Sequence, residues 1–140
     1  MSDPLYAKEL LRLAAAATGA GRLADFDAEG SAHNPTCGDR VGVTLKLDEA
    51  GRIAAVAHET SACVLAQASA SILGAHLAGA DAAAVADLRA AVASMLREGD
   101  LPPPPFGDYA ALQGAATYRN RHTCVLLPID AVLNALLVKS

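Results

Sequence analysis

The spacing of hydrophobic and polar residues changes along the chain, and each change marks an expected element. Leucines at helical spacing predict a first helix that starts at Pro4, with Asp3 as its N-cap, and extends to Thr18. The segment 23–35 has no such period and is rich in Asp, Gly, Ser and Asn. This composition predicts an irregular connection between the first helix and the next element.

A two-residue repeat begins after Pro35. In the segment 41–47, hydrophobic residues alternate with smaller or polar ones, which is typical of a half-buried strand. The residues 48–51 form a turn sequence, and 53–58 can run back as a second strand. The sequence therefore predicts a β-hairpin in the middle of the chain.

The second half of the chain returns to helical periodicity. It predicts helices over 62–77 and 82–97, and a last helix from about 128 to 138. Prolines at 102–105 exclude a helix there, and a weaker amphipathic stretch covers 109–116.

Length and charge exclude several classes of protein. The 140 residues indicate a single domain over 1–140, long enough to fold without a metal or a disulfide. A net charge of −4 argues against non-specific nucleic-acid binding, and no apolar run is long enough for a membrane helix. Asp3 and Glu9 do not fit the basic start of a signal peptide, so we expect a cytoplasmic protein.

The chain has three cysteines, an odd number that fits a disulfide framework poorly. In a chain without an export signal, cysteines are metal ligands, nucleophiles or core residues. The pattern places Cys37 in the loop before the first strand, Cys63 in the first turn of a helix and Cys124 just before the last helix. Positions at the ends of helices and strands favour roles as metal ligands or nucleophiles over a role in the hydrophobic core.

The string Cys37-Gly38-Asp39 is the strongest candidate for metal binding. Gly38 permits a tight bend, so that a thiolate and a carboxylate can converge on one ion. Zinc accepts both kinds of donor in a four-coordinate shell, which Cys63 and Cys124 would complete. Two alternatives stay open: Asp39 is a cap or turn residue, or three thiolates leave a fourth position for water or a substrate sulfur.

Two features favour a thiolate at the other cysteines. The amino end of a helix stabilises a thiolate at Cys63, and Arg121 places a cation three residues before Cys124. Both features suit metal binding and sulfur transfer equally well, so they do not distinguish between these functions.

The four histidines carry less information. His58 and His76 fall within expected elements, which favours structural or surface roles. His33 and His122 are expected in loops close to Cys37 and Cys124. For these two, a structural role is favoured, and a role as ligand or proton carrier stays open.

Several short strings together resemble a known family. They are Asn34 to Asp39, Cys63 followed by Gln67 to Ser71, and Arg121 with Cys124. Their order and spacing are similar to those of the U-type iron–sulfur cluster assembly proteins, IscU and the N-terminal domain of NifU.

The SufU branch of this family is the most similar. The stretch between the second and third cysteines is long, and it contains Leu112-Gln113-Gly114, which resembles a recurring string of that branch. Thr123 precedes the third cysteine, where IscU proteins carry a histidine.

The resemblance implies an α+β fold of the SufE/NifU kind. In that fold a small antiparallel sheet of about three strands carries helices on one face, so a third strand is expected within 23–35 or 117–122. The family motif also implies which residues bind the metal, which is zinc or alternatively a [2Fe–2S] cluster. The implied ligands are Cys37, Asp39, Cys63 and Cys124.

The resemblance implies two functions in iron–sulfur cluster assembly. In the first, the protein is a zinc-dependent sulfurtransferase that accepts persulfide sulfur from a cysteine desulfurase of the SufS or IscS kind. Cys37 is then the candidate sulfur acceptor, Cys124 the alternative acceptor, and Arg121 supports the thiolate. In the second, the protein is a non-enzymatic scaffold that assembles a [2Fe–2S] cluster and transfers it to downstream acceptor proteins. A third reading, from another class of function, is a regulatory binding module with a purely structural zinc, which binds a desulfurase without taking its sulfur.

Overall fold

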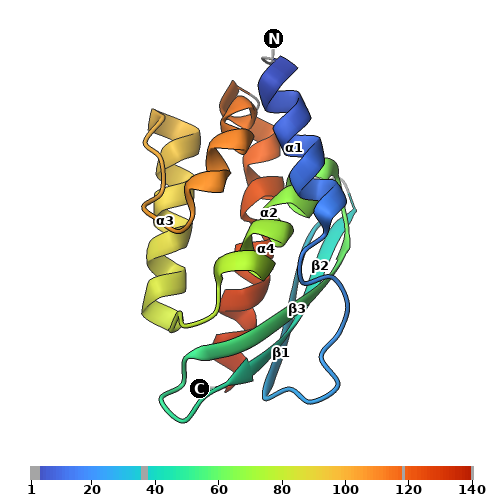
Figure 1. The fold of residues 1–140 in the computed structure, drawn as a ribbon, viewed down its shortest axis with the longest axis vertical. Coiled ribbons are helices and arrows are strands. Elements are labelled where there is room, and N and C mark those ends of the chain that lie inside the picture. The colour runs from blue at the N-terminus through green and yellow to red at the C-terminus, as the bar shows by residue number, and fades with distance from the viewer. Residues whose placement is uncertain (1–3, 36–37, 118, 140) are drawn as a thin grey trace.

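One antiparallel sheet and a layer of helices on one of its faces form the fold (Figure 1). The computed structural model describes residues 4–35, 38–117 and 119–139. The described elements, in chain order, are α1 (Pro4–Ala16), β1 (Ala28–Asn34), β2 (Asp39–Leu47), β3 (Ile53–Ser61), α2 (Val64–His76), α3 (Ala82–Glu98), the 3-10 helix η1 (Gly107–Thr117) and α4 (Arg119–Lys139).

The predicted hairpin is confirmed and forms two thirds of the sheet. β2 and β3 pair from Arg40 opposite Ser61 to Leu47 opposite Ile53, with a register shift near the turn. Val41, Val43 and Leu45 of β2 are buried beneath the helices, as the two-residue repeat predicts. The observed strands extend beyond the predicted ones because they pair beyond the hydrophobic runs.

The third strand, β1, lies in the first of the two predicted intervals. It pairs with β2 in the strand order β1-β2-β3, from Ala28 opposite Leu45 to Asn34 opposite Asp39. Glycine is required within β1, since a Cβ atom on Gly30 would lie 2.4 Å from the backbone nitrogen of Ala135. The small residues of this strand therefore allow the backbone of α4 to pack directly on the sheet.

The last helix starts nine residues earlier than its expected start near Pro128, because α4 begins at Arg119. Pro128 lies inside this helix, where it lacks the N–H group that would donate to the carbonyl of Cys124. The helix continues through the proline because residues on either side of it, including Val125 and Ile129, are fully buried in the core. The prediction that Cys124 precedes the last helix is therefore wrong: it lies within α4.

The other helices agree with the predictions. Asp81 caps α3 by accepting a hydrogen bond from the backbone N–H of Ala84, and Gly99 ends that helix in the left-handed conformation. The segment 102–105 is not helical, and the amphipathic stretch that follows forms η1. α2 packs against α1, α4 and β3. No helix in the described ranges combines the length and the apolar character needed to cross a membrane.

Candidate metal centre

Three potential ligands meet at one end of the sheet. Asp39 is the first residue of β2, Cys63 is the N-cap of α2, and Cys124 lies in the second turn of α4. One carboxylate oxygen and the two sulfur atoms lie within 4.8 Å of one another. Three elements that are distant in the sequence thus contribute one donor atom each.

The turn between β1 and β2 directs Asp39 toward the helices. Gly38 adopts a positive φ of 75°, which favours glycine, and its N–H donates to the carbonyl of Asn34 over 2.8 Å. Asn34 is also the strand partner of Asp39. The strand alternation then places the Asp39 side chain on the buried face, where the residue is 9% exposed.

Cys63 is fixed by the start of α2. Its backbone is extended, and its carbonyl accepts a hydrogen bond from the N–H of Gln67 over 3.0 Å. The side-chain amide of Gln67 donates back to the carbonyl of Ala62 over 3.0 Å. Gln67 thereby braces the segment that leads into the helix and holds the half-buried Cys63 at its amino end.

Cys124 is the buried member of the group, with an exposed fraction of 2%. Its thiol donates a hydrogen bond to Oδ2 of Asp39 over 3.4 Å. Burial raises the pKa of the Cys124 thiol, and the nearby Cys63 and Asp39 raise it further. A bound cation has the opposite effect, because its charge favours the thiolate form of a ligand.

The donor set fits a zinc ion. Zinc binds thiolate sulfur and carboxylate oxygen, and structural sites of this kind have four ligands. Two sulfur atoms and one oxygen are already grouped among the described residues. Cys37, the predicted fourth ligand, lies outside the described residues, as does its neighbour Thr36. Its role as a ligand stays a prediction.

The other predicted site residues lie around this group. Arg121 is exposed in the first turn of α4, three residues before Cys124, and its support of a thiolate stays a prediction. His33 is exposed in β1 and His122 is half-buried in α4, so the expectation that both lie in loops is wrong. Neither histidine belongs to the group of potential ligands found among the described residues.

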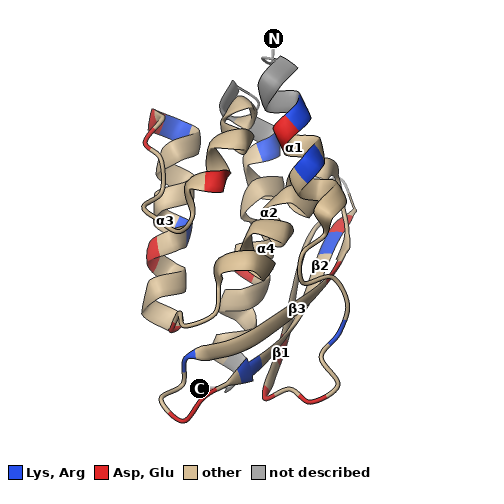
Figure 2. Cartoon of the chain, viewed as in Figure 1, with Lys and Arg blue, Asp and Glu red and all other residues tan. Residues whose placement is uncertain are grey.

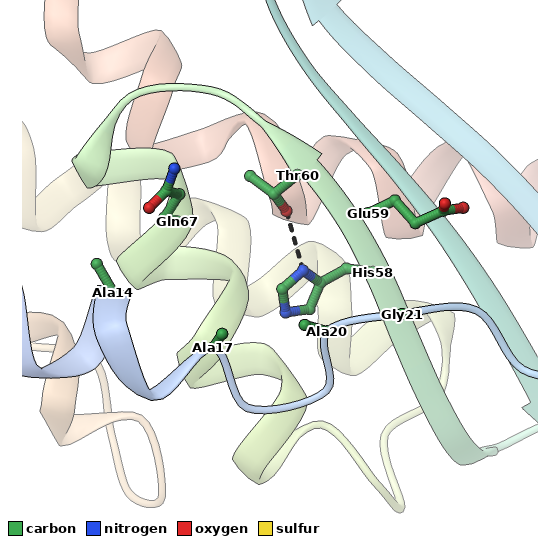
Figure 3. Close-up of a pocket in the computed structure, with 8 residues that line it drawn as sticks. All are labelled: Ala14, Ala17, Ala20, Gly21, His58, Glu59, Thr60 and Gln67. Carbon is green, nitrogen blue, oxygen red and sulfur yellow. Dashed lines mark hydrogen bonds between the residues drawn. The ribbon is translucent and has the colours of Figure 1, made fainter.

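His58 has the structural role that was predicted for it. The buried ring lies next to a cavity of about 200 Å³ between the end of α1, β3 and α2 (Figure 3). Its Nε2 is 3.0 Å from the carbonyl of Thr18, and its Nδ1 is 2.9 Å from Oγ1 of Thr60. Because a carbonyl only accepts, Nε2 carries the proton and Nδ1 accepts from the hydroxyl. His58 thus joins the end of α1 to β3.

Fold and site together define the class of protein. The family model of the NifU-like N terminal domain matches residues 5–125, and the chain belongs to this family. The predicted resemblance to U-type proteins and the predicted α+β fold are confirmed.

Individual relatives agree with this assignment. The chain is 33% identical over 102 residues to the zinc-dependent sulfurtransferase SufU of Bacillus subtilis, covering 71% of this chain and 68% of the relative. The crystal structure of an N-terminal NifU-like protein from Brucella abortus has a TM-score of 0.86 and 34% identity, covering 94% of this chain and 92% of that one. These similarities agree with the predicted SufU-like role in iron–sulfur cluster assembly.

A third relative shows the fold alone. It is an iron–sulfur cluster assembly scaffold protein for the SUF system from Fervidobacterium islandicum, with a TM-score of 0.79 and 19% identity. The alignment covers 92% of this chain and 94% of the other.

Proposed function

We propose that this protein is a zinc-containing acceptor of persulfide sulfur from a cysteine desulfurase. The observation that carries the proposal is the grouping of Asp39, Cys63 and Cys124 within 4.8 Å at one end of the sheet. Similarity to the zinc-dependent sulfurtransferase SufU supports zinc as the metal and sulfur transfer as the reaction.

In this proposal Cys37, Asp39, Cys63 and Cys124 hold the ion. Bound zinc lowers the pKa of its cysteine ligands and so supplies thiolates at neutral pH. The chain provides the geometry: the turn at Gly38 orients Asp39, and the amino end of α2 holds Cys63.

The transfer step is an exchange at sulfur. A cysteine thiolate of this chain attacks the terminal sulfur of the desulfurase persulfide, and a new S–S bond forms. The old S–S bond breaks, and the desulfurase cysteine leaves as a thiolate. The acceptor cysteine is left as a persulfide, and no external oxidant or reductant is needed.

We assign the attack to Cys37, with Cys124 as the alternative acceptor. The burial of Cys124 supports this order, because the sulfur of a large partner must reach the attacking thiolate. The exposed Arg121 lies on the same side of α4 as Cys124 and is proposed to support the charge of a thiolate there. A ligand from the partner that replaces Cys37 at the metal would free this cysteine for attack.

The metal content of protein purified without oxygen or chelators tests the proposed site. One zinc per chain is expected, and the variants Asp39→Ala, Cys63→Ser and Cys124→Ser should lose it. Asp25→Ala is the matched control, because this exposed carboxylate pairs with Lys46 and should not affect the metal. Full zinc content in all three ligand variants would contradict the assignment.

The transfer step is tested with a SufS-type desulfurase and cysteine. Mass spectrometry after alkylation should detect a persulfide on the wild-type chain and none on Cys37→Ala. Acceptance at the wild-type rate by Cys37→Ala would show that another cysteine, with Cys124 first, is the acceptor.

The alternative function is a [2Fe–2S] scaffold that serves downstream acceptor proteins. The same four residues would hold the cluster, since thiolates are the usual ligands of iron–sulfur clusters. Iron and acid-labile sulfide in equal amounts, in place of zinc, would favour this alternative.

A further inference from the structure

The two faces of β2 differ at the site end. Asp39 points toward the helices and belongs to the metal centre, whereas the next residue, Arg40, is exposed on the opposite face. Figure 2 shows basic and acidic positions side by side on the ribbon near the β2 label. Arg40 is therefore adjacent to the site without being part of it.

Among the residues that the structure describes, the chain covers one half of the outer face of the sheet. The connection between α1 and β1 crosses the half nearer the hairpin turn. There the N–H of Leu23 donates to Oγ1 of Thr44 over 3.0 Å, and Thr44 is buried. In the same half Lys46 is paired with Asp25 over 3.1 Å.

In the other half, next to the proposed metal centre, the described residues leave the outer face exposed. This half consists of two rows of cross-strand neighbours that we call the site-end patch. Its members are His33, Arg40 and Ser61 in one row and Ser31, Gly42 and Glu59 in the other.

The site-end patch is hollowed. Five of its members are exposed, and an added Cβ atom on Gly42 would meet no atom within 4 Å. A cavity of about 430 Å³ lies over this part of the sheet. Its lining consists of Thr60 and five members of the patch: Ser31, Arg40, Gly42, Glu59 and Ser61. The hollow is large enough to receive a side chain of a partner.

Of the charged residues in the patch, Glu59 has an oppositely charged neighbour and Arg40 has none among the described residues. Glu59 lies 3.8 Å from the guanidinium of Arg22, which also binds Glu29 over 2.5 Å. The guanidinium of Arg40 has no hydrogen bond or ion pair in the described part of the chain. The patch thus offers an unpaired cation in a chain with a net charge of −4.

We propose that the site-end patch is a docking surface for an acidic segment of the cysteine desulfurase, with a carboxylate of that partner paired to Arg40. This inference rests on the proposed function, which requires the desulfurase to approach the same end of the sheet. A guanidinium binds a carboxylate through two parallel hydrogen bonds, so Arg40 fixes both the charge and the orientation of the partner. The hollow at Gly42 accommodates the side chain that carries the carboxylate.

The test measures the binding of a SufS-type cysteine desulfurase to the zinc-loaded protein at low ionic strength. Arg40→Glu is expected to raise the dissociation constant about tenfold or more. The matched control is Arg52→Glu, because Arg52 is also an exposed arginine and lies at the opposite end of the same hairpin. The control should bind within about twofold of the wild type. The difference between the two variants should shrink at high salt, because salt screens exposed charges.

Four readouts separate this proposal from the proposed function: sulfur transfer, desulfurase binding, zinc content and oligomeric state. Sulfur transfer by the wild type tests the function itself, and its absence together with normal binding would overturn only the function. Equal binding by wild type and Arg40→Glu would overturn the docking surface, as would loss of zinc from that variant. A change of oligomeric state in Arg40→Glu would assign the patch to a second copy of this chain instead. Absence of wild-type binding would overturn both.

Discussion

At the scale of single residues, His58 shows how one buried ring joins two elements. The neutral ring donates from Nε2 to the carbonyl of Thr18 and accepts at Nδ1 from Thr60. Burial lowers the pKa of His58, although its bond to Thr18 partly opposes this effect. The folded state therefore favours the neutral ring more than the unfolded state does.

This difference predicts a pH dependence of stability. The folded pKa lies below the unfolded value of about 6.5, so the unfolded chain binds the proton more readily. The stability due to His58 is thus fully present above the unfolded pKa and is lost as the pH falls through the folded pKa. Urea unfolding at a series of pH values from neutral to mildly acid should show a steeper loss of stability for wild type than for His58→Gln. The exposed His33→Gln should behave as wild type; a wild-type pH profile for His58→Gln would contradict this role.

Gly30 predicts a second effect at the residue scale. A Cβ atom there would lie 2.6 Å from Cα of Ala135 and 2.8 Å from the carbonyl oxygen of Ala131, both backbone atoms of α4. Gly30→Ala should therefore cost about 1–3 kcal/mol in the free energy of unfolding. Gly42→Ala is a control in the same sheet, because its Cβ would meet no atom within 4 Å. Equal stability of the two variants by urea unfolding would contradict the close approach.

At the scale of elements, hydrophobic periodicity predicted the hairpin and most helices but not β1 or the start of α4. β1 contains only small and polar residues, because the backbone of α4 packs against it, and so it has no β-branched signal. The apolar pattern predicts a start near Pro128, and proline is a residue that favours the first turn of a helix. Tertiary packing instead maintains α4 through Pro128, an effect that no local pattern reveals.

A buried hydrogen-bond chain joins three of these elements. The hydroxyl of Tyr109 in η1 lies 2.7 Å from Oγ of Ser69 in α2, and Ser69 donates to the carbonyl of Val125 in α4 over 2.8 Å. All three residues are fully buried. The segment before α4 thereby fixes the backbone immediately after Cys124.

This hydrogen-bond network predicts that substitutions at Ser69 and Tyr109 have strongly non-additive effects on the free energy of unfolding. Ser69→Ala leaves the buried hydroxyl of Tyr109 without its partner at 2.7 Å, removes the bond to the carbonyl of Val125, and should cost about 1–3 kcal/mol. Adding Tyr109→Phe removes the stranded hydroxyl, so the double variant should be less destabilised than the sum of the single variants. Denaturant unfolding of the four proteins measures the coupling, and additive effects would contradict a shared network.

At the scale of the whole molecule, the hydrophobic core and the proposed metal centre should be separate sources of stability. The core is continuous from the sheet through α2, α3 and α4, and it is built from aliphatic side chains. Removal of zinc with a chelator should lower the melting temperature without unfolding the chain. Zinc at one hundred times its dissociation constant would contribute about 2.7 kcal/mol. Loss of the far-ultraviolet circular dichroism signal on chelation at room temperature would contradict this division.

The sequence identified three of the potential ligands better than it identified their surroundings. The string around Asp39 and the positions of Cys63 and Cys124 identified three donors that do converge in the folded chain. Spacing alone could not place Cys124 inside a helix or show its burial. It also could not identify Arg40, because the open half of the outer face exists only once the connection before β1 has crossed the sheet.

The hydrogen bond between Cys124 and Asp39 spans 85 residues of the chain, which has a consequence for biosynthesis. A ribosome delivers the carboxylate and Cys63 long before Cys124, so the growing chain presents an incomplete set of donors. The full set is grouped only after α4 has emerged and has packed on β1. In the proposed zinc-binding function, these three donors can therefore hold an ion together only once α4 is present, and a chain truncated before α4 would lack Cys124 as a ligand.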